Sequence, residues 1–273
     1  MVPTVELNNG VRMPQVGFGV YKIPDGQVVG ALRTAFDAGY RNVDTATLYR
    51  NERGVGVAIA ESGLPREDVF VTTKLWNTDH GHDEAMRAFD TSLNLLGLDY
   101  VDLYLIHWPV PSADRYVPTW QALRKIAEAG RARAIGVSNF QVEHLRRLVE
   151  ETGVVPAVNQ IELHPWLQQS QLRAFHSAHG IVTEAWAPIA RGGARLGDEV
   201  LDRLARKHGK TPAQVVLRWH VELGHVVIPK SVTPKRIVEN IDIFDFELDE
   251  QDMSAMATLD HGHRTGPHPD SMG

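Results

Sequence analysis

Short runs rich in β-branched and aromatic residues alternate with longer stretches of helical spacing along the chain. Eight such runs occur, at residues 15–20, 40–45, 68–74, 100–108, 132–138, 156–163, 181–186 and 225–231. Most of the helical stretches between them end on glycine, which readily takes the left-handed conformation after a helix. Eight strand–helix repeats in 273 residues, with no Pro-rich or Ser-rich linker, favour a closed barrel over an open doubly wound sheet. We therefore predict a single α/β domain, a (β/α)8 TIM barrel, over residues 1–273.

Three segments fall outside these eight repeats. Asn9-Gly10 between short apolar flanks predicts a β-hairpin before the first strand. Two helical stretches, 199–210 and 211–224, lie between the seventh and eighth strands, where the barrel needs only one. A further helix is predicted at 249–260. We expect the extra helices, after strand 7 and after the last barrel helix, to be caps or walls of a site.

Composition narrows the possible partners. The net charge of −6 and a pI near 6.1 give no basic excess that would attract nucleic acid or an anionic membrane. No apolar run approaches the ~20 residues of a membrane span, and MVPTVELNNG does not resemble a signal peptide. The absence of cysteine excludes disulfides and cysteine nucleophiles, and it fits a reducing compartment. We predict a cytoplasmic protein that binds neither nucleic acid nor membrane.

Titratable residues stand at the ends of three consecutive predicted strands. Asp44 ends the second strand, with Tyr49 in the loop after it, Lys74 ends the third, and His107 ends the fourth. Each residue alone has an ordinary explanation as a turn residue, a packed ring, a solvated cation or a core histidine. Active sites of this barrel lie at the carboxyl ends of the strands, so we expect these side chains to converge there.

The chemistry that suits these four groups is carbonyl reduction. When a hydride reaches a carbonyl carbon, negative charge grows on the oxygen, which needs a proton or hydrogen bonds. The phenol of Tyr49 can give that proton, and the ammonium of Lys74 is expected to lower its pKa. Asp44 would keep Lys74 charged and oriented, while His107 could donate a second hydrogen bond to the substrate oxygen.

At these positions the chain resembles a known family, the aldo-keto reductases. The resemblance covers nearly the whole sequence and is closest to the bacterial 2,5-diketo-D-gluconate reductase and prostaglandin F synthase-like branch. The motifs that show the resemblance occur in the family's order and at its spacing. They are GYRNVDTATLYRNE (39–52), TTKLW (72–76), LYLIHWP (103–109), IGVSNF (135–140), VNQIELHP (158–165) and IPKSVTPKRIVEN (228–240).

The resemblance implies roles for individual residues. The catalytic tetrad falls on Asp44, Tyr49, Lys74 and His107, with Tyr49 as proton donor, in agreement with the reasoning from chemistry. Further positions implied for the nicotinamide half of the cofactor are Ser138, Asn139 and Gln160 on the carboxamide and Trp186 beneath the ring.

The cofactor implied is NADPH, and the sequence carries a phosphate signal of its own. The Gly-rich dinucleotide fingerprint fails at 17–22 and at 54–59, so those glycines are expected to serve turns and close packing. Basic residues instead surround a predicted helix start after the eighth strand. The family resemblance places Lys230, Ser231, Val232 and Arg236 on the 2′-phosphate and Glu239 and Asn240 on the adenine.

The substrate side is marked by aromatic residues next to the strand ends. Tyr21, Trp76 and Trp108, with His107, match the positions that line the family's pocket. Arg50 stands where the family usually has glycine after its catalytic tyrosine, and could bring positive charge to the mouth. The short polar tail HGHRTGPHPDSMG indicates a reduced carboxyl-terminal loop.

Other functions fit the sequence less well. A Schiff-base aldolase would need a lysine without a carboxylate partner, and a short-chain dehydrogenase would need lysine four residues after a tyrosine, which none has. The histidine pairs at 80–82 and 261–263 have no third ligand at suitable spacing, so no metal is predicted. A nucleotide-binding barrel with little turnover remains the alternative.

We predict an NADPH-dependent oxidoreductase that reduces aldehydes and ketones, dicarbonyl or sugar-derived compounds among them, as a monomer.

Overall fold

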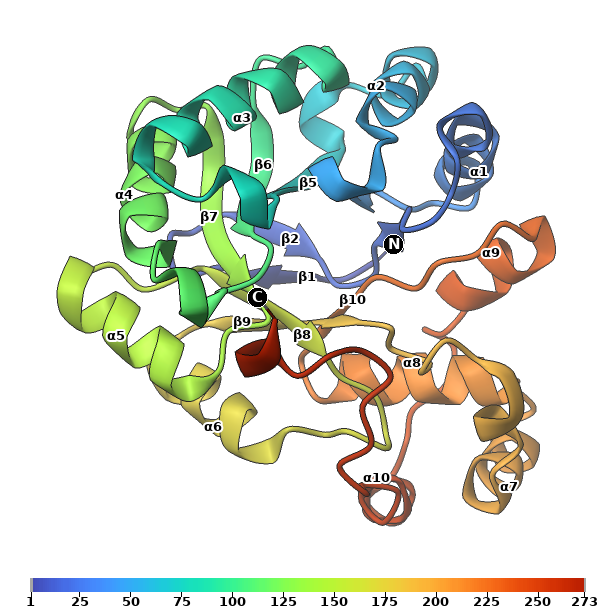
Figure 1. The fold of residues 1–273 in the computed structure, drawn as a ribbon. Helices are drawn as coiled ribbons and strands as arrows, with labels where there is room; N and C mark the ends of the chain where they lie inside the picture. The colour runs from blue at the N-terminus through green and yellow to red at the C-terminus, as the bar shows by residue number, and fades with distance from the viewer. Residues whose placement is uncertain (1, 273) are drawn as a thin grey trace.

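Eight parallel strands form the barrel in a computed structural model that describes residues 2–272 (Figure 1). Each strand pairs with its neighbours in chain order, from first to last. The strands are β3 (Phe18–Gly19), β4 (Asn42–Asp44), β5 (Phe70–Leu75), β6 (Val101–Ile106), β7 (Ala132–Ser138), β8 (Val158–Glu162), β9 (Val182–Trp186) and β10 (Val226–Val227). The predicted (β/α)8 barrel is confirmed.

The first and last strands meet and close the barrel. A parallel bridge joins Val16 to Val227, and Gly19 N–H donates to the carbonyl of Pro229 at 3.2 Å. Glycine is required at position 19, because an added Cβ would lie 2.9 Å from the carbonyl oxygen of Ile228. Both closing strands are shorter than predicted. Pro229 has no N–H to donate, so a regular ladder cannot run through it.

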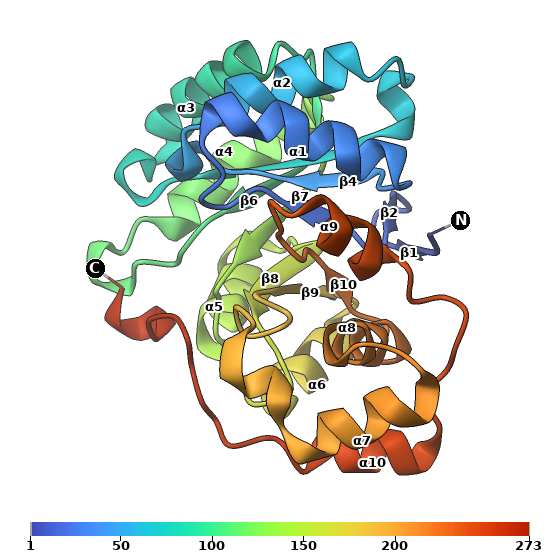
Figure 2. The same cartoon turned by 90° about the vertical axis from the view of Figure 1, so that its right-hand side faces the viewer.

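Helices surround the barrel in the order expected from the sequence. The eight that follow the strands are α1 (Asp25–Asp37), α2 (Glu52–Glu61), α3 (His82–Leu96), α4 (Tyr116–Glu128), α5 (Val142–Thr152), α6 (Ser170–His179), α8 (Pro212–Glu222) and α9 (Pro234–Ile241). Their apolar faces pack on the strands in one continuous core. The two predicted extra helices are present as α7 (Glu199–His208) and α10 (Glu250–Ala257), which lie side by side (Figure 2).

The predicted hairpin, β1 (Thr4–Glu6) and β2 (Arg12–Pro14), covers one end of the barrel. Leu7 and Met13 are buried against Phe70 and Val158, which begin β5 and β8. The hairpin therefore seals the amino-terminal end of the strands and leaves the carboxyl-terminal end open.

The segment after α10 crosses that open end. It runs across the front of the barrel and ends near its centre (Figure 1). Glu162, at the end of β8, accepts hydrogen bonds from the backbone N–H and hydroxyl of Thr265 and from the N–H of Gly266. The tail is therefore tied to the mouth of the barrel. Within residues 2–272, no helix combines the length and apolar character needed to cross a membrane.

Candidate active site

A buried ion pair lies at the base of the open end of the barrel. Lys74 of β5 places its Nζ 2.7 Å from both carboxylate oxygens of Asp44 at the end of β4. Both side chains are almost completely buried, so the pair is screened little by water. The same Nζ also lies 2.9 Å from the carbonyl oxygen of Thr45. The close partners of Lys74 keep its ammonium group in one place.

Tyr49 lies above this pair, at the end of the 3-10 turn η1 (Thr47–Tyr49). Its hydroxyl oxygen is 3.4 Å from Lys74 Nζ. An ammonium group has no acceptor, so Tyr49 oxygen accepts from Lys74 and keeps its own proton free. The expectation that Lys74 lowers the pKa of Tyr49 is wrong for this structure. Burial, followed by the negative charge of Asp44, raises the pKa of Tyr49 well above its usual value.

His107 follows β6 and lies beside the phenol, with ring centres 5.8 Å apart. Burial, aided by the charge of Lys74, lowers the pKa of His107 well below its ordinary value, so the ring is neutral at neutral pH. Its Nδ1 is buried and has no hydrogen-bond partner among the residues that the structure describes. A buried donor without a partner is rarer than an acceptor without one, which favours the tautomer with the proton on Nε2.

Amide side chains from the next strands complete this end of the site. Asn139, just after β7, takes the left-handed conformation (φ 64°) and donates through Nδ2 to the carbonyl oxygen of His107. Its Oδ1 accepts a 2.7 Å bond from the indole N–H of Trp186. Gln160 of β8 donates at 2.8 Å to Asp44. Ser138 is buried, and its hydroxyl donates a hydrogen bond to the backbone carbonyl of Gln160. It does not line the cavity.

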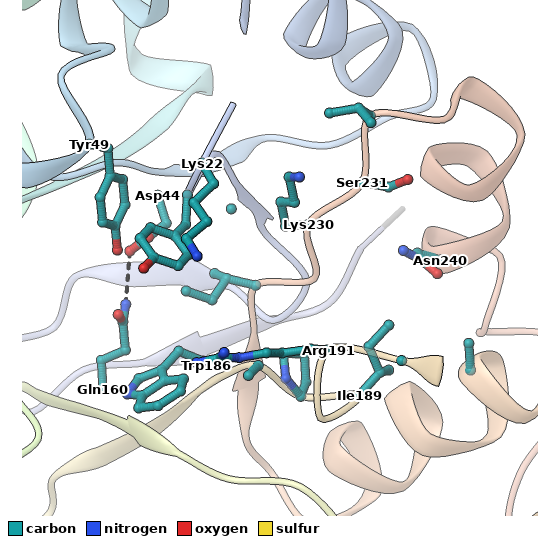
Figure 3. A pocket seen from close by; sticks show the side chains of 18 of the residues that line it. Lys22, Asp44, Tyr49, Gln160, Trp186, Ile189, Arg191, Lys230, Ser231 and Asn240 are labelled. Atoms are coloured by element: carbon teal, nitrogen blue, oxygen red, sulfur yellow. Dashed lines mark hydrogen bonds between the residues drawn. The ribbon is translucent and has the colours of Figure 1, made fainter. Parts of the chain in front are cut away.

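A cavity of about 770 Å³ extends from this group towards α9 (Figure 3). Asp44, Tyr49 and Gln160 lie at one end, Ser231 and Asn240 lie at the other, and Lys230 lies between them. Of the predicted catalytic and cofactor residues, those that line it are Asp44, Tyr49, His107, Asn139, Gln160, Trp186, Lys230, Ser231, Val232, Arg236, Glu239 and Asn240. Lys74 lies beneath the lining. The structure therefore brings nearly all the predicted site residues to one cavity.

The far end of the cavity is basic. Lys230 and Arg236 line it, and neither forms an ion pair within residues 2–272. Thr233 precedes α9, whose first backbone N–H groups are not bonded within the helix. Unpaired cations beside a helix start favour a bound anion such as a phosphate.

The aromatic residues predicted for the substrate lie at the near end. Tyr21, Trp76 and Trp108 all line the cavity, and the ring centre of Trp76 is 5.2 Å from that of His107. Arg50 does not line it, contrary to the idea that it brings charge to the mouth. Arg50 has φ of 56°, the left-handed conformation that favours glycine, which agrees with the glycine usual at this position in the family it resembles.

Two cations of the cavity were not predicted. Both Lys22 and Arg191 line it, Lys22 close to Asp44 and Arg191 on the opposite side from Lys230 (Figure 3). Both lie in loops after strand ends, β3 and β9, so the rule that located the tetrad could have located them. The described residues contain no group of three or more His, Cys, Asp or Glu side chains that could hold a metal.

Known proteins resemble this chain over nearly its full length. A sequence model of the aldo/keto reductase family matches residues 15–261. An aldo-keto reductase of Mycolicibacterium smegmatis is 55% identical over 269 residues, covering 98% of both chains. The methylglyoxal reductase DkgA of Escherichia coli is 51% identical over 273 residues, covering 99% of this chain and 98% of that one. A crystal structure of a Gox0644 mutant in complex with NADPH is 47% identical, with a TM-score of 0.96, and covers 100% of this chain and 99% of that one.

These matches confirm the resemblance on which the sequence analysis relied. The oxidoreductase class, the NADPH cofactor and the reduction of aldehyde and ketone groups are thereby confirmed at the level of the family. Since the family model covers most of the chain and the relatives are matched almost end to end, the chain belongs to the aldo/keto reductase family.

Proposed function

We propose that this chain reduces small aldehydes and ketones, dicarbonyls among them, and that Tyr49 gives the proton. The observation that carries the proposal is the phenol of Tyr49 at the base of the cavity, 3.4 Å from the buried ammonium of Lys74 and beside His107. A carbonyl compound that enters the cavity would reach Tyr49 and His107, which line it, with Lys74 directly beneath the phenol. NADPH, when bound, supplies the hydride for the carbonyl carbon.

The residues of the cavity fit that cofactor. The unpaired cations Lys230 and Arg236, with the start of α9, would hold the 2′-phosphate. Glu239 and Asn240 would face the adenine, and Trp186 would lie beneath the nicotinamide ring. Asn139 and Gln160 would hold the carboxamide. Ser138 would act by holding the backbone of Gln160, because its hydroxyl donates to the backbone carbonyl of that residue.

The proton follows from the hydrogen bonds at Tyr49. Lys74 donates to the phenol oxygen, which leaves the phenol proton free to point into the cavity. The raised pKa keeps that proton in place at neutral pH, until charge grows on the carbonyl oxygen. As the hydride reaches the carbonyl carbon, the phenol proton passes to the carbonyl oxygen and the product is an alcohol. As charge then develops on Tyr49, the ammonium of Lys74 stabilises it, while Asp44 holds Lys74 and His107 donates a second hydrogen bond.

The dicarbonyl class is supported by two observations. The methylglyoxal reductase DkgA of Escherichia coli is 51% identical to this chain. The near end of the cavity is lined by the aromatic rings of Tyr21, Trp76 and Trp108, which leave room for a small carbonyl compound and shield the growing charge from water. We also propose a monomer, by analogy with the branch of the family that the chain resembles. A cytoplasmic location is compatible with the absence of cysteine.

The variant Tyr49→Phe tests the proton donor. It removes one hydroxyl, so kcat for methylglyoxal should fall by about 10²- to 10⁴-fold, the usual contribution of a general acid. The Kd of NADPH, measured by fluorescence quenching, should change little. Tyr100→Phe makes the same change outside the cavity and serves as the control.

Turnover by Tyr49→Phe near the wild-type rate would refute the assigned role. A wild type that binds NADPH tightly but reduces none of a panel of dicarbonyls, sugars and simple ketones would instead support a nucleotide-binding protein with little turnover.

A further inference from the structure

A second buried carboxyl group lies next to the tetrad and has no part in the mechanism above. Glu184 of β9 is fully buried, in register with Gln160 of β8 on one side and Val226 of β10 on the other. Its Oε2 accepts a 2.8 Å hydrogen bond from Gln160 Nε2. The same nitrogen donates its other proton, also at 2.8 Å, to Asp44 Oδ2.

Gln160 thus links two carboxyl groups through one amide nitrogen. An amide nitrogen has two protons, and both are used here, one on Asp44 and one on Glu184. This arrangement fixes which end of the amide is nitrogen, and Gln160 must therefore turn its carbonyl oxygen away from both carboxyl groups. Because Gln160 lines the cavity, its orientation matters to whatever binds there.

The hydrogen bonds show which of the two carboxyl groups can bear a negative charge. Asp44 accepts two bonds from Lys74 and one from Gln160. Within residues 2–272, Glu184 accepts only one, and its Oε1 is buried without a partner. Glu184 differs from His107, whose two tautomers are both neutral. A buried carboxylate charge with neither a cation nor a full set of donors costs far more free energy than a neutral carboxylic acid with one unpartnered oxygen. Lys74 supplies one positive charge, and Asp44 already neutralises it.

We propose that Glu184 is a positioning residue that acts as a neutral, protonated carboxylic acid, holding Gln160 in place and leaving Asp44 as the sole partner of Lys74. The inference rests on the proposed function for its catalytic consequence, while its protonation state stands on the hydrogen bonds alone. Glu184 does not itself line the cavity, and within residues 2–272 its side chain forms one hydrogen bond, with Gln160.

Ionisation of Glu184 would disturb the tetrad directly. The charged and titratable groups around it are Asp44 on β4, Lys74 on β5 and Tyr49 on η1, and its register partners Gln160 and Val226 are not titratable. Burial, and then the charge of Asp44, raises the pKa of Glu184 to about 8. A negative charge at Glu184 raises the pKa of Tyr49 further, which makes the phenol a poorer acid. Reduction should therefore decline once the pH rises above that value.

The pH profile of kcat/KM for methylglyoxal, measured with saturating NADPH, tests this link. In the wild type the profile should fall above pH 8, by roughly tenfold per pH unit where only the protonated form is active. In Glu184→Gln the group cannot ionise, so that alkaline decline should disappear or move to higher pH. Glu52→Gln is the matched control, because Glu52 is also a buried carboxyl but accepts its bond from Thr73 and not from Gln160.

A spectroscopic experiment tests the protonation state without catalysis. With a carbon-13 label in the glutamate carboxyl groups, the wild type at pH 7 should show a protonated-glutamate resonance that Glu184→Gln lacks. This resonance should titrate at alkaline pH. Circular dichroism would first show that the variants fold.

The two experiments separate the possible failures. The inference is wrong if the protonated-glutamate resonance is absent. It is also wrong if Glu184→Gln shows the same alkaline decline in kcat/KM as the wild type and as Glu52→Gln. Should the wild type reduce no carbonyl compound, the proposed function fails, yet the labelled spectrum still decides whether Glu184 holds a proton.

Discussion

Arg236 carries a positive charge into the far end of the cavity and forms no ion pair within the described residues. A charged side chain that faces a cavity without a carboxylate partner can bind an anion without first breaking an internal bond. The 2′-phosphate is the one group that NADPH has and NADH lacks, so Arg236 should affect the two cofactors differently.

The variant Arg236→Ala should weaken NADPH binding by about 10- to 100-fold, the effect of losing one hydrogen bond to a charged group. NADH binding should change far less. Kd values for both cofactors, from fluorescence quenching, give the comparison, and Lys235→Ala removes the neighbouring charge that does not line the cavity. An equal loss for both cofactors would place the phosphate elsewhere.

The sequence predicts that the residues at consecutive strand ends converge, and the structure does bring Asp44, Lys74 and His107 together around Tyr49. It could not show the hydrogen bonds that decide their protonation. The pairing of Lys74 with Asp44 is predictable from the sequence, but the complete burial of Tyr49 is not. Burial and the charge of Asp44 raise the pKa of Tyr49, whereas the charge of Lys74 alone would lower it. Glu184 was passed over, since a carboxyl inside a strand gives no signal in the sequence that it meets Asp44 through Gln160.

At the scale of elements, the carboxyl-terminal tail is part of the site. Gly266 lies against the indole of Trp186, so close that an added Cβ would be 2.6 Å from Cη2. Its backbone N–H is held by Glu162 at the end of β8. Met272, at the end of the described chain, lines the cavity. The tail therefore presses on the ring proposed to lie beneath the nicotinamide.

The variant Gly266→Ala should push the indole of Trp186 away from its hydrogen bond with Asn139. We expect the Kd of NADPH to rise several-fold, because the stacking surface moves while the phosphate contacts stay. Gly30→Ala, within α1, is the matched control, since an added Cβ there meets no atom within 4 Å. If both variants bind NADPH equally well, the tail does not set the position of Trp186.

The strands and helices were predictable because their apolar spacing repeats along the chain, whereas the tail was not. Residues 258–268 have no periodic pattern, and their position depends on a bond from Thr265 to Glu162, 103 residues away in sequence. The sequence pattern also predicts longer closing strands than β3 and β10, which the structure shows. The pattern of 225–231 continues through Pro229, which cannot donate to a ladder.

At the scale of the whole molecule, buried neutral histidines link folding to pH. His176 of α6 is almost fully buried and lies between Asn159 of β8 and Thr183 of β9. The amide of Asn159 also donates to the carbonyl of Phe140, so its nitrogen must face the histidine. His176 Nε2 therefore accepts and cannot carry a proton without placing two donors against each other. Burial lowers the pKa of His176 to about 3, and that of His225 likewise.

The sign of the resulting pH dependence follows from these lowered values. Below about pH 6.5 the unfolded chain binds a proton on each histidine, whereas the folded chain does not until the pH approaches about 3. The free energy of unfolding should thus fall as the pH is lowered through this range, by about 2 kcal/mol per buried histidine between pH 7 and pH 5. Urea unfolding at both pH values measures it. In His176→Gln the difference between the free energies of unfolding at pH 7 and pH 5 should shrink by about that amount. His179→Gln changes an exposed residue on the same helix and is the control, in which the difference should stay as in the wild type. An unaltered difference in His176→Gln would mean that His176 takes up its proton in the folded barrel.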